Sequence, residues 1–384
     1  MAAASVTRRL RSTSVGLASL AALLAAVAGG AAAPTASLQD DRLAVTPLAE
    51  IPARLDLVAA TGARVTRIDV LWRDVAPSKP VQATNPADPA YDWQRTDTIM
   101  RGLKARGIRA VIADIFLSPS WAARTADPGA APRPEELARF AGALAARYSG
   151  RYPDPLGGVL PEIRWIEPWN EPNIGRYFKP QCERRAGRLV PTSPAAYAEI
   201  LRQAGVAIKA ANPNALIVAG SAGPQGGRQR RCRTPNDSVG VQLLLDELRV
   251  RGVPFDVWSQ HIYPIGAPQI APFFPSFRTL GRLEAELARI RPEIPIFVDE
   301  TGYHSSYSRA HRYFVSERQQ AGWLQATWEV AAKHPQVALV TWFNLQDNPD
   351  WTGGLLRANE SRKPSHAAFV AITQRFPPGP EWTP

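Results

Sequence analysis

The stretch IRWIEPWN, residues 163–170, is an apolar and aromatic run that ends in polar residues. Branched and aromatic residues in a run of this length are typical of a buried strand. The next residues are EPN, so Glu171 stands between Asn170 and Pro172 directly after the run. A carboxylate at the end of a buried strand is costly unless a neighbouring group uses it. The stretch therefore predicts a buried strand and makes Glu171 a candidate functional residue.

Similar runs recur along the chain and alternate with helical stretches. Six of them lie at 65–72, 109–116, 216–223, 255–263, 295–302 and 338–344, and a weaker candidate for the first strand is LQDDRLAVT at 38–46. Apolar residues recur at helical spacing over 134–149, 193–211, 238–252 and 316–334. A strand followed by a helix, repeated eight times, predicts an α/β fold with one (β/α)8 TIM barrel over residues 34–384. The alternative is an open doubly wound sheet, but no glycine-rich phosphate loop follows the first strand.

Residues 1–33 have the pattern of a secretory signal peptide. Arg8, Arg9 and Arg11 precede an apolar run of small residues that ends in an Ala-x-Ala site, so we expect cleavage near Ala33. The alternative is an uncleaved membrane anchor, although the run is alanine-rich and only weakly hydrophobic. No later segment of the sequence has enough uninterrupted apolar length to span a bilayer. We expect a secreted or envelope-associated protein.

The formal net charge of +11 is carried by arginine far more than by lysine. Only six of the 45 basic residues are lysines. Such an excess of arginine is typical of the coding bias of a GC-rich genome, so the net charge alone is weak evidence for an anionic ligand. No nucleic-acid-binding motif accompanies the arginines. We therefore expect no nucleic-acid partner.

Two glutamates are the candidate catalytic residues. Glu171 ends the fourth predicted strand, and Glu300, in DETG at 299–302, ends the seventh. Barrel active sites form at the C-terminal ends of the strands, so the two carboxyls would face each other across the mouth. Such a pair suits cleavage of a glycosidic bond, in which one protonated carboxyl releases the leaving oxygen and one charged carboxyl attacks the anomeric carbon.

Each of these residues also has a purely structural interpretation. Glu171 could cap a helix before the turn at Pro172. Glu300 could be a salt-bridged surface residue with Asp299 as the functional acid, since alternation along a strand lets only one of the pair face the mouth. Arg67, in a strand, needs a carboxylate partner whatever the function.

Four motifs resemble the clan A glycoside hydrolases, most closely families 39 and 5: WNEPN at 169–173, HIY at 261–263, DETG at 299–302 and TRIDVLW around Arg67. The resemblance implies a retaining mechanism with Glu171 as acid/base and Glu300 as nucleophile. It implies that Arg67 and Tyr263 bond the nucleophile. By the same match, Asn170 holds the sugar 2-hydroxyl, His261 supports the acid/base and Trp342 forms the floor of the subsite for the scissile sugar.

Aromatic side chains gather where the predicted strands end. Aromatic rings stack on the apolar faces of pyranoses, and the tryptophans that fall at or just after strand ends are Trp72, Trp121, Trp169, Trp342 and Trp351. Of the first two, Trp121 is the candidate substrate-binding residue. Core packing is the alternative for both.

The loops after the fourth and fifth predicted strands are long and rich in arginine. Their basic residues are Arg176, Lys179, Arg184, Arg185, Arg188, Arg228, Arg230, Arg231 and Arg233, which would form a rim that attracts an anionic glycan, or else solvated loops of an arginine-biased chain. Cys182 and Cys232 lie in the same two loops. An even cysteine count in an exported chain favours a disulfide between them, although two isolated thiols remain an alternative.

These observations favour an exported retaining glycosidase that acts on a carbohydrate, as a monomer. The alternative is a barrel that only holds glycan, as a wall-associated binding module would, but such a module needs neither catalytic carboxylate. The five histidines show no metal-ligand spacing, and two carboxylates suffice for the chemistry. We therefore expect no cofactor and no metal.

Overall fold

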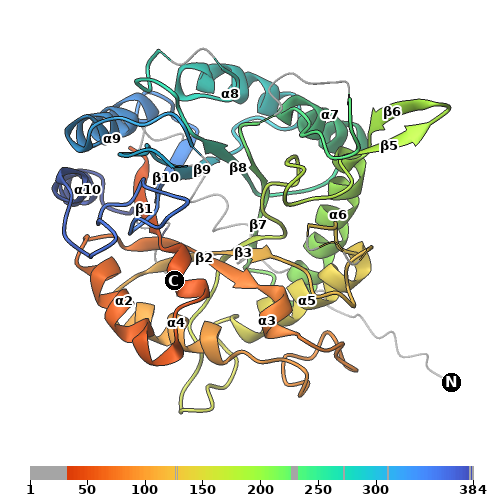
Figure 1. The fold of residues 1–384 in the computed structure, drawn as a ribbon. Coiled ribbons are helices and arrows are strands. Elements are labelled where there is room, and N and C mark those ends of the chain that lie inside the picture. Colours follow the sequence, from red (N-terminus) through yellow and green to blue (C-terminus); the bar gives the residue numbers. More distant parts are fainter. Residues whose placement is uncertain are drawn as a thin grey trace, which may run out of the picture.

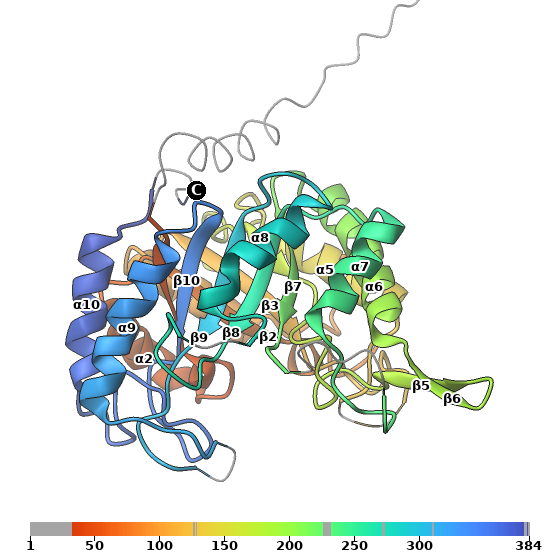
Figure 2. The same cartoon turned by 90° about the horizontal axis from the view of Figure 1, so that it is seen from above.

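The computed structural model describes residues 33–379 and 382, apart from 126, 128, 226–231, 271–272 and 309–310. Its strands form a closed barrel in the order β1-β10-β9-β8-β7-β4-β3-β2, and the helices surround it (Figures 1 and 2). Every strand pair within the barrel is parallel. The predicted (β/α)8 barrel is confirmed. The predicted signal peptide lies, except for Ala33, outside the described residues.

The barrel strands match the predicted runs except at the first and fourth. They are β1 (Thr35–Gln39), β2 (Val65–Leu71), β3 (Ala110–Phe116), β4 (Trp165–Glu167), β7 (Leu216–Ala222), β8 (Val257–Ile262), β9 (Ile296–Thr301) and β10 (Val337–Phe343). The prediction of a strand at 38–46 is wrong beyond Gln39, because the Asp40 side chain caps a 3-10 turn, Asp41–Ala44. β4 ends before Pro168, which cannot donate to a strand ladder.

The four helices predicted from periodicity are confirmed within a few residues. The longer helices of the described chain are α2 (Ile51–Ala59), α4 (Gln94–Ala105), α5 (Pro134–Arg147), α6 (Ser193–Ala211), α7 (Val241–Arg251), α8 (Leu280–Ala288), α9 (Glu317–Ala331) and α10 (Pro364–Arg375), with a single turn, α3 (Trp72–Val75), after β2. Within the described ranges, no helix has the length and apolar content that crossing a bilayer requires.

The interior of the barrel has an apolar layer below and an ionic layer above. Inward-facing residues of the lower layer pack in one cluster that Trp382 closes, with its ring 4.7 Å from that of Trp165. Two residues further along β2, β3 and β4, the inward positions are occupied by Arg67, Asp114 and Glu167. Because side chains two residues apart on a strand point to the same side, these charged side chains lie directly above the apolar layer, at the mouth of the barrel.

A two-stranded hairpin, β5 (Cys182–Arg185) and β6 (Arg188–Pro191), projects outward beyond α6 and α7 (Figures 1 and 2). An isolated hairpin is only marginally stable in water. The predicted disulfide between Cys182 and Cys232 is confirmed, with 6.3 Å between the Cα atoms, and it ties the base of the hairpin to the loop after β7. Closing a loop of 50 residues in this way contributes roughly 2–4 kcal/mol of stability in the chain-entropy account.

Candidate active site

The site is organised around the guanidinium of Arg67, which β2 holds at the centre of the barrel mouth with no exposed surface. Its Nε donates to Glu167 Oε2 at 2.7 Å, and its Nη2 donates to Asn170 Oδ1 at 3.0 Å. Its Nη1 donates to both Gln39 Oε1 and Glu300 Oε1 at 2.8 Å. Further carboxylates around it belong to Asp299 at 3.3 Å, Asp114 at 3.4 Å and Asp69 at 3.7 Å.

Removing the arginine would leave several buried carboxylates without compensation. A lost partner in a buried ion pair typically costs about 3–5 kcal/mol. The cluster also holds more carboxylates than Arg67 can neutralise. Burial raises the pKa of Glu167 and of Asp114 well above the usual range, which favours the protonated form of both carboxyls. Burial would also raise the pKa of Asp299, but His261 and Arg67 hold it below its ordinary value.

Glu300 lies on β9 and keeps a small exposed surface, 8 % of the residue. The Tyr263 hydroxyl donates to its Oε2 while Arg67 holds its Oε1. Burial raises the pKa of Glu300, and the positive charges of His261 and Arg67 oppose that rise. Two donors and two cations thus favour the ionised carboxylate in a site that water reaches poorly.

A β-bulge in β9 brings Asp299 and Glu300 to the same side of the strand. The residues of β8 from Ser259 to His261 pair with Phe297 and Glu300, so β9 has one extra residue. Asp299 and Glu300 consequently both contact Arg67, at 3.3 Å and 2.8 Å. The expectation that strand alternation turns only one of them inward is wrong, because the bulge breaks that alternation.

His261, on β8, joins the two predicted catalytic carboxyls. Its Nδ1 lies 2.9 Å from Glu171 Oε1 and 3.4 Å from Glu300 Oε2, and its Nε2 lies 3.5 Å from Asp299 Oδ1. Burial alone would lower the pKa of His261, but the surrounding carboxylates raise it well above its ordinary value. The carboxylates on both sides of the ring therefore favour its protonated form.

Glu171 follows β4 in a left-handed backbone conformation, with φ at 44°. Such a conformation costs a non-glycine residue free energy and is typical of functional sites. Its N–H donates to Ser221 O at 2.9 Å, which fixes the turn. Gly223 stands beside its carboxylate, where a Cβ would lie only 2.6 Å from Glu171 Oε1. The backbone therefore directs the half-buried carboxyl into the mouth and keeps space beside it.

Oxygen atoms of Glu171 and Glu300 and a ring nitrogen of His261 lie within 4.8 Å of one another. This spacing would also suit a metal ion. A neutral imidazole offers one nitrogen lone pair to a metal, whereas an imidazolium offers none. The same three side chains are also placed for acid–base and nucleophilic chemistry.

The aromatic residues correct one expectation. Trp342 has no exposed surface, and its Nε1 donates to Gly353 O at 3.0 Å, so its ring offers no face to a sugar. The next residue, Phe343, is half-buried, and its ring lies 6.5 Å from that of Tyr263 and 5.0 Å from that of Trp351. Phe343 and Trp351, rather than Trp342, form the aromatic side of the mouth.

Three other tryptophans at predicted strand ends have packing partners of their own. Trp121 is half-buried, its ring meets that of Trp72 edge to face at 5.6 Å, and its Nε1 donates to Ala76 O at 2.9 Å. Trp72 and Trp169 are buried in the core. The structure thus brings together Glu171, Glu300, Arg67, Asn170, His261 and Tyr263, and leaves Trp121 and Trp342 outside the group.

Sequence reasoning missed Gln39, Asp69, Asp114 and Glu167. Gln39 pairs with Arg67 in the β1–β2 register, Asp69 lies two residues after Arg67, and Asp69, Asp114 and Glu167 pair in turn across β2, β3 and β4. The available signal was a polar residue at period two within an otherwise apolar run. Scanning every predicted strand for that signal would have found Asp69, Asp114 and Glu167.

No family model and no curated protein matches the sequence. Among solved structures, the chain is similar to a family 39 glycoside hydrolase from the gut symbiont Bacteroides cellulosilyticus WH2, with a TM-score of 0.62, 19 % identity and coverage of 88 % of this chain and 63 % of the other. It is similar to a monomeric β-xylosidase from Caulobacter crescentus CB15, with a TM-score of 0.59, 18 % identity and coverage of 90 % and 70 %.

A third similar structure is GH5_18 from Streptomyces cattleya in complex with GlcNAc, with a TM-score of 0.61, 17 % identity and coverage of 90 % and 81 %. The predicted resemblance to clan A families 39 and 5 is thus confirmed at the level of the fold. At these identities the likeness establishes fold alone. The chain spans 63 % of the length of the Bacteroides protein.

Proposed function

We propose that the chain is a retaining glycoside hydrolase in which Glu300 is the nucleophile and Glu171 the acid/base. The observation that carries the proposal is the pair of carboxyls, which have different hydrogen-bond partners and of which one oxygen each lies within 4.8 Å of the other. Arg67 and Tyr263 hold Glu300, whereas His261 bonds Glu171. Retaining enzymes place their carboxyls about 5–5.5 Å apart, and inverting enzymes about 6.5–9.5 Å apart.

In the first step, a carboxylate oxygen of Glu300 bonds to the anomeric carbon while the glycosidic C–O bond breaks. Glu171 gives its proton to the departing oxygen. The developing positive charge on the sugar is stabilised by the Glu300 carboxylate, which Arg67 and Tyr263 hold in position before the reaction. His261 Nδ1 lies 2.9 Å from Glu171 Oε1 and keeps the Glu171 carboxyl directed at the leaving oxygen.

In the second step, water attacks the anomeric carbon of the glycosyl ester. The Glu171 carboxylate now takes the proton of that water, and the bond to Glu300 breaks, which restores both carboxyls. Asn170 accepts from Arg67 through Oδ1, so its amide N–H groups are available to a sugar hydroxyl. Phe343 and Trp351 offer aromatic surface beside the nucleophile.

A screen of aryl glycosides followed by covalent labelling tests the proposal. We expect wild-type protein to cleave at least one aryl glycoside with retention of anomeric configuration, and a matching 2-deoxy-2-fluoro glycoside to label Glu300. Peptide mapping by mass spectrometry identifies the labelled residue. Inversion of configuration, or failure to cleave any glycoside across neutral, amino and uronic sugars and envelope polysaccharides, would refute the mechanism.

We propose further that an exported form uses the β5–β6 hairpin to hold an anionic glycan. Arg184, Arg185 and Arg188 are exposed on it, with Glu183 as the one acidic side chain between Cys182 and Pro191. The hairpin follows the loop that carries Glu171, so it extends the rim on the leaving-group side. Of the other predicted rim residues, Lys179 pairs with Asp127 at 3.0 Å, and Arg228, Arg230 and Arg231 lie outside the described residues.

Replacing Arg184, Arg185 and Arg188 together with serine is expected to weaken binding to an anionic polysaccharide such as polygalacturonate by roughly tenfold at low salt. Binding by wild-type protein should also fall steeply between about 50 and 300 mM NaCl, since surface charges are screened over that range. Co-sedimentation measures both effects. The control replaces three exposed arginines near the ends of α7, α8 and α10 with serine: Arg249, Arg289 and Arg375. Equal loss in both triple variants would indicate general charge and not the hairpin.

A further inference from the structure

The WNEPN motif ends in Asn173, a residue to which the proposed mechanism gives no role. Asn173 has no exposed surface, so its side chain cannot touch a sugar. It lies two residues after Glu171 in the loop that follows β4, and its amide is directed at the loop that follows β7. A buried amide costs free energy unless its polar atoms are paired, so its partners show what it holds in place.

Asn173 engages both backbone polar groups of Gly223, the first residue after β7. Its Oδ1 accepts from Gly223 N at 2.9 Å, and its Nδ2 donates to Gly223 O at 2.9 Å. The same Nδ2 lies 3.2 Å from Val239 O and 3.3 Å from Gln225 O. Val239 N in turn donates to the backbone oxygen of Asn173 at 3.0 Å. One asparagine thus fixes Gly223 and joins the loop after β4 to both ends of the loop after β7.

Gly223 bounds the space that the Glu171 carboxyl occupies. A Cβ at residue 223 would lie 2.6 Å from Glu171 Oε1, 2.9 Å from Glu171 Cδ and 2.7 Å from Ile174 Cγ1, all closer than non-bonded atoms approach. Glu171 Oε1 also lies 2.9 Å from His261 Nδ1. This oxygen is therefore confined between the imidazole and the glycine, and a shift of Gly223 toward the carboxyl would displace it.

The backbone of Glu171 is held separately from its carboxyl. Glu171 N donates to Ser221 O at 2.9 Å, which ties the start of the loop to β7. Further along, a Cβ at Gly175 would lie only 1.8 Å from Asn236 O, so the two loops also meet backbone to backbone. These contacts do not involve the side chain of Asn173. That side chain acts on the carboxyl end of Glu171, through Gly223.

We propose that Asn173 is a positioning residue for the acid/base: it holds Gly223 against the Glu171 carboxyl and so fixes the place from which that carboxyl passes its proton. This rests on the proposed function of Glu171. A displacement of about 1 Å at a reacting group can cost roughly 100-fold in rate. Loss of Asn173 should therefore slow the steps that need a proton from Glu171 and spare a step that needs none.

The test compares the phenyl and 2,4-dinitrophenyl glycosides of the sugar that wild-type protein cleaves best. A phenol needs a proton to leave, whereas dinitrophenolate leaves without one. We expect Asn173→Ala to lower kcat/KM by about 100-fold for the phenyl glycoside and by less than about threefold for the dinitrophenyl glycoside. In a Glu171→Ala background, the same substitution should cost less than about threefold on either substrate, since the group that it positions is already gone.

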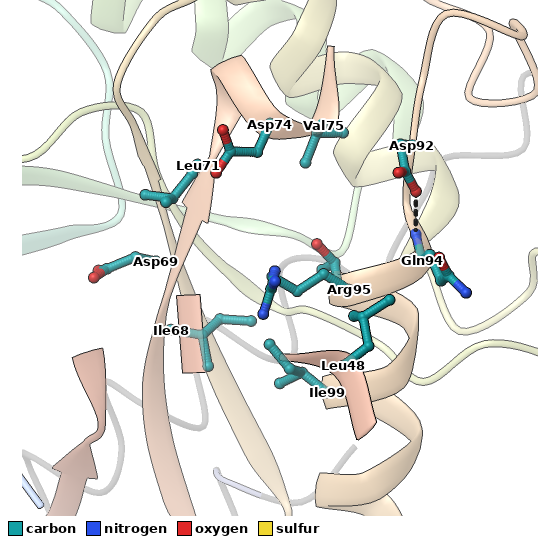
Figure 3. A pocket seen from close by; sticks show the side chains of 11 residues that line it. Leu48, Ile68, Asp69, Leu71, Asp74, Val75, Asp92, Gln94, Arg95 and Ile99 are labelled. Atoms are coloured by element: carbon teal, nitrogen blue, oxygen red, sulfur yellow. Dashed lines mark hydrogen bonds between the residues drawn. The ribbon is translucent and has the colours of Figure 1, made fainter. Parts of the chain in front are cut away.

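Gly223→Ala tests the same contact without removing a hydrogen bond. Its methyl group would meet Glu171 Oε1 at 2.6 Å, so it should lower the phenyl rate as Asn173→Ala does and again spare the dinitrophenyl rate. Two controls should leave the ratio of the two rates unchanged. Asn212→Ala removes an equally buried amide between α6 and β7, at the other end of the barrel. Val75→Ile adds a methyl group where a cavity of about 200 Å³ between β2 and α4 has room for it (Figure 3).

Equal losses on both glycosides at an unchanged melting temperature would overturn the inference, and so would losses that add fully in the Glu171→Ala background. Should Asn173→Ala not fold, Gly223→Ala decides alone. If Glu171→Ala itself spares the phenyl glycoside, or if no glycoside is cleaved, the proposed function fails instead. Crystal structures of wild-type and Gly223→Ala protein then test the positioning without turnover. We expect Glu171 Oε1 to move out of hydrogen-bond reach of His261 Nδ1, and an unchanged contact of 2.9 Å would contradict the inference.

Discussion

Glu300→Gln is expected to lower kcat on an aryl glycoside by roughly 10⁴-fold or more, the largest effect of any single substitution in the chain. Glutamine has nearly the same shape and can keep contacts with Arg67 and Tyr263, which both reach the Glu300 carboxylate. It carries no charge to stabilise the oxocarbenium-like transition state, and its amide is a poor nucleophile. Steady-state hydrolysis of the best substrate from the screen measures the loss.

The matched control is Glu317→Gln, which makes the same change at the first residue of α9, where Glu317 pairs with Arg357 at 2.6 Å. It should keep near-normal activity. If Glu300→Gln retained near-normal turnover, or if the fluorosugar labelled another residue, the assignment would be wrong. Asp299 would then be the first replacement to test, because the bulge brings it to the same arginine.

Glu171→Ala is expected to reduce kcat/KM on substrates with poor leaving groups by about 10²–10⁴-fold, the usual contribution of a general acid. Dinitrophenyl glycosides should form the glycosyl ester at nearly the wild-type rate, because their leaving group needs no proton. Hydrolysis of that ester should then be slow, since no general base remains. Azide should restore the rate by attacking the anomeric carbon in the space that the shorter side chain leaves.

The azide product distinguishes acid/base loss from general damage. We expect a glycosyl azide that retains the configuration of the substrate, identified by NMR. Glu300→Gln serves as the control, since it forms no ester for azide to attack. A Glu171→Ala protein that loses activity equally on all leaving groups and does not respond to azide would assign Glu171 a structural role instead.

Most of the fold could be predicted from the sequence because apolar residues recur with a different period in strands and in helices. Period two in VTRIDVL and helical spacing in 193–211 each placed an element with small error. The hairpin β5–β6 was not predicted, because each strand has only four residues and, of the eight, only Cys182 is buried, so no period-two pattern can be recognised. A disulfide and a turn hold that hairpin, and neither contributes to hydrophobic periodicity.

The sequence also predicted which side chains of the WNEPN, HIY and DETG motifs meet at Arg67. It could not predict the bulge in β9, which depends on how three strands align and leaves no local pattern. The assignment of Trp342 to the floor of the sugar subsite was wrong for the same reason. Both are aromatic and adjacent, and only the register of β10 decides that Trp342 faces the core.

Closure of the barrel pairs the first strand of the described chain with the last, so that Thr35 lies beside Leu339. During synthesis, the sheet therefore keeps two unpaired edges until the last strand, β10, has emerged from the ribosome. Arg67 and Glu300, 233 positions apart, cannot meet before then. Contacts of such high sequence separation fold slowly and leave unpaired edges open to aggregation. We therefore expect nascent chains that still lack β10 to aggregate more readily than the finished protein.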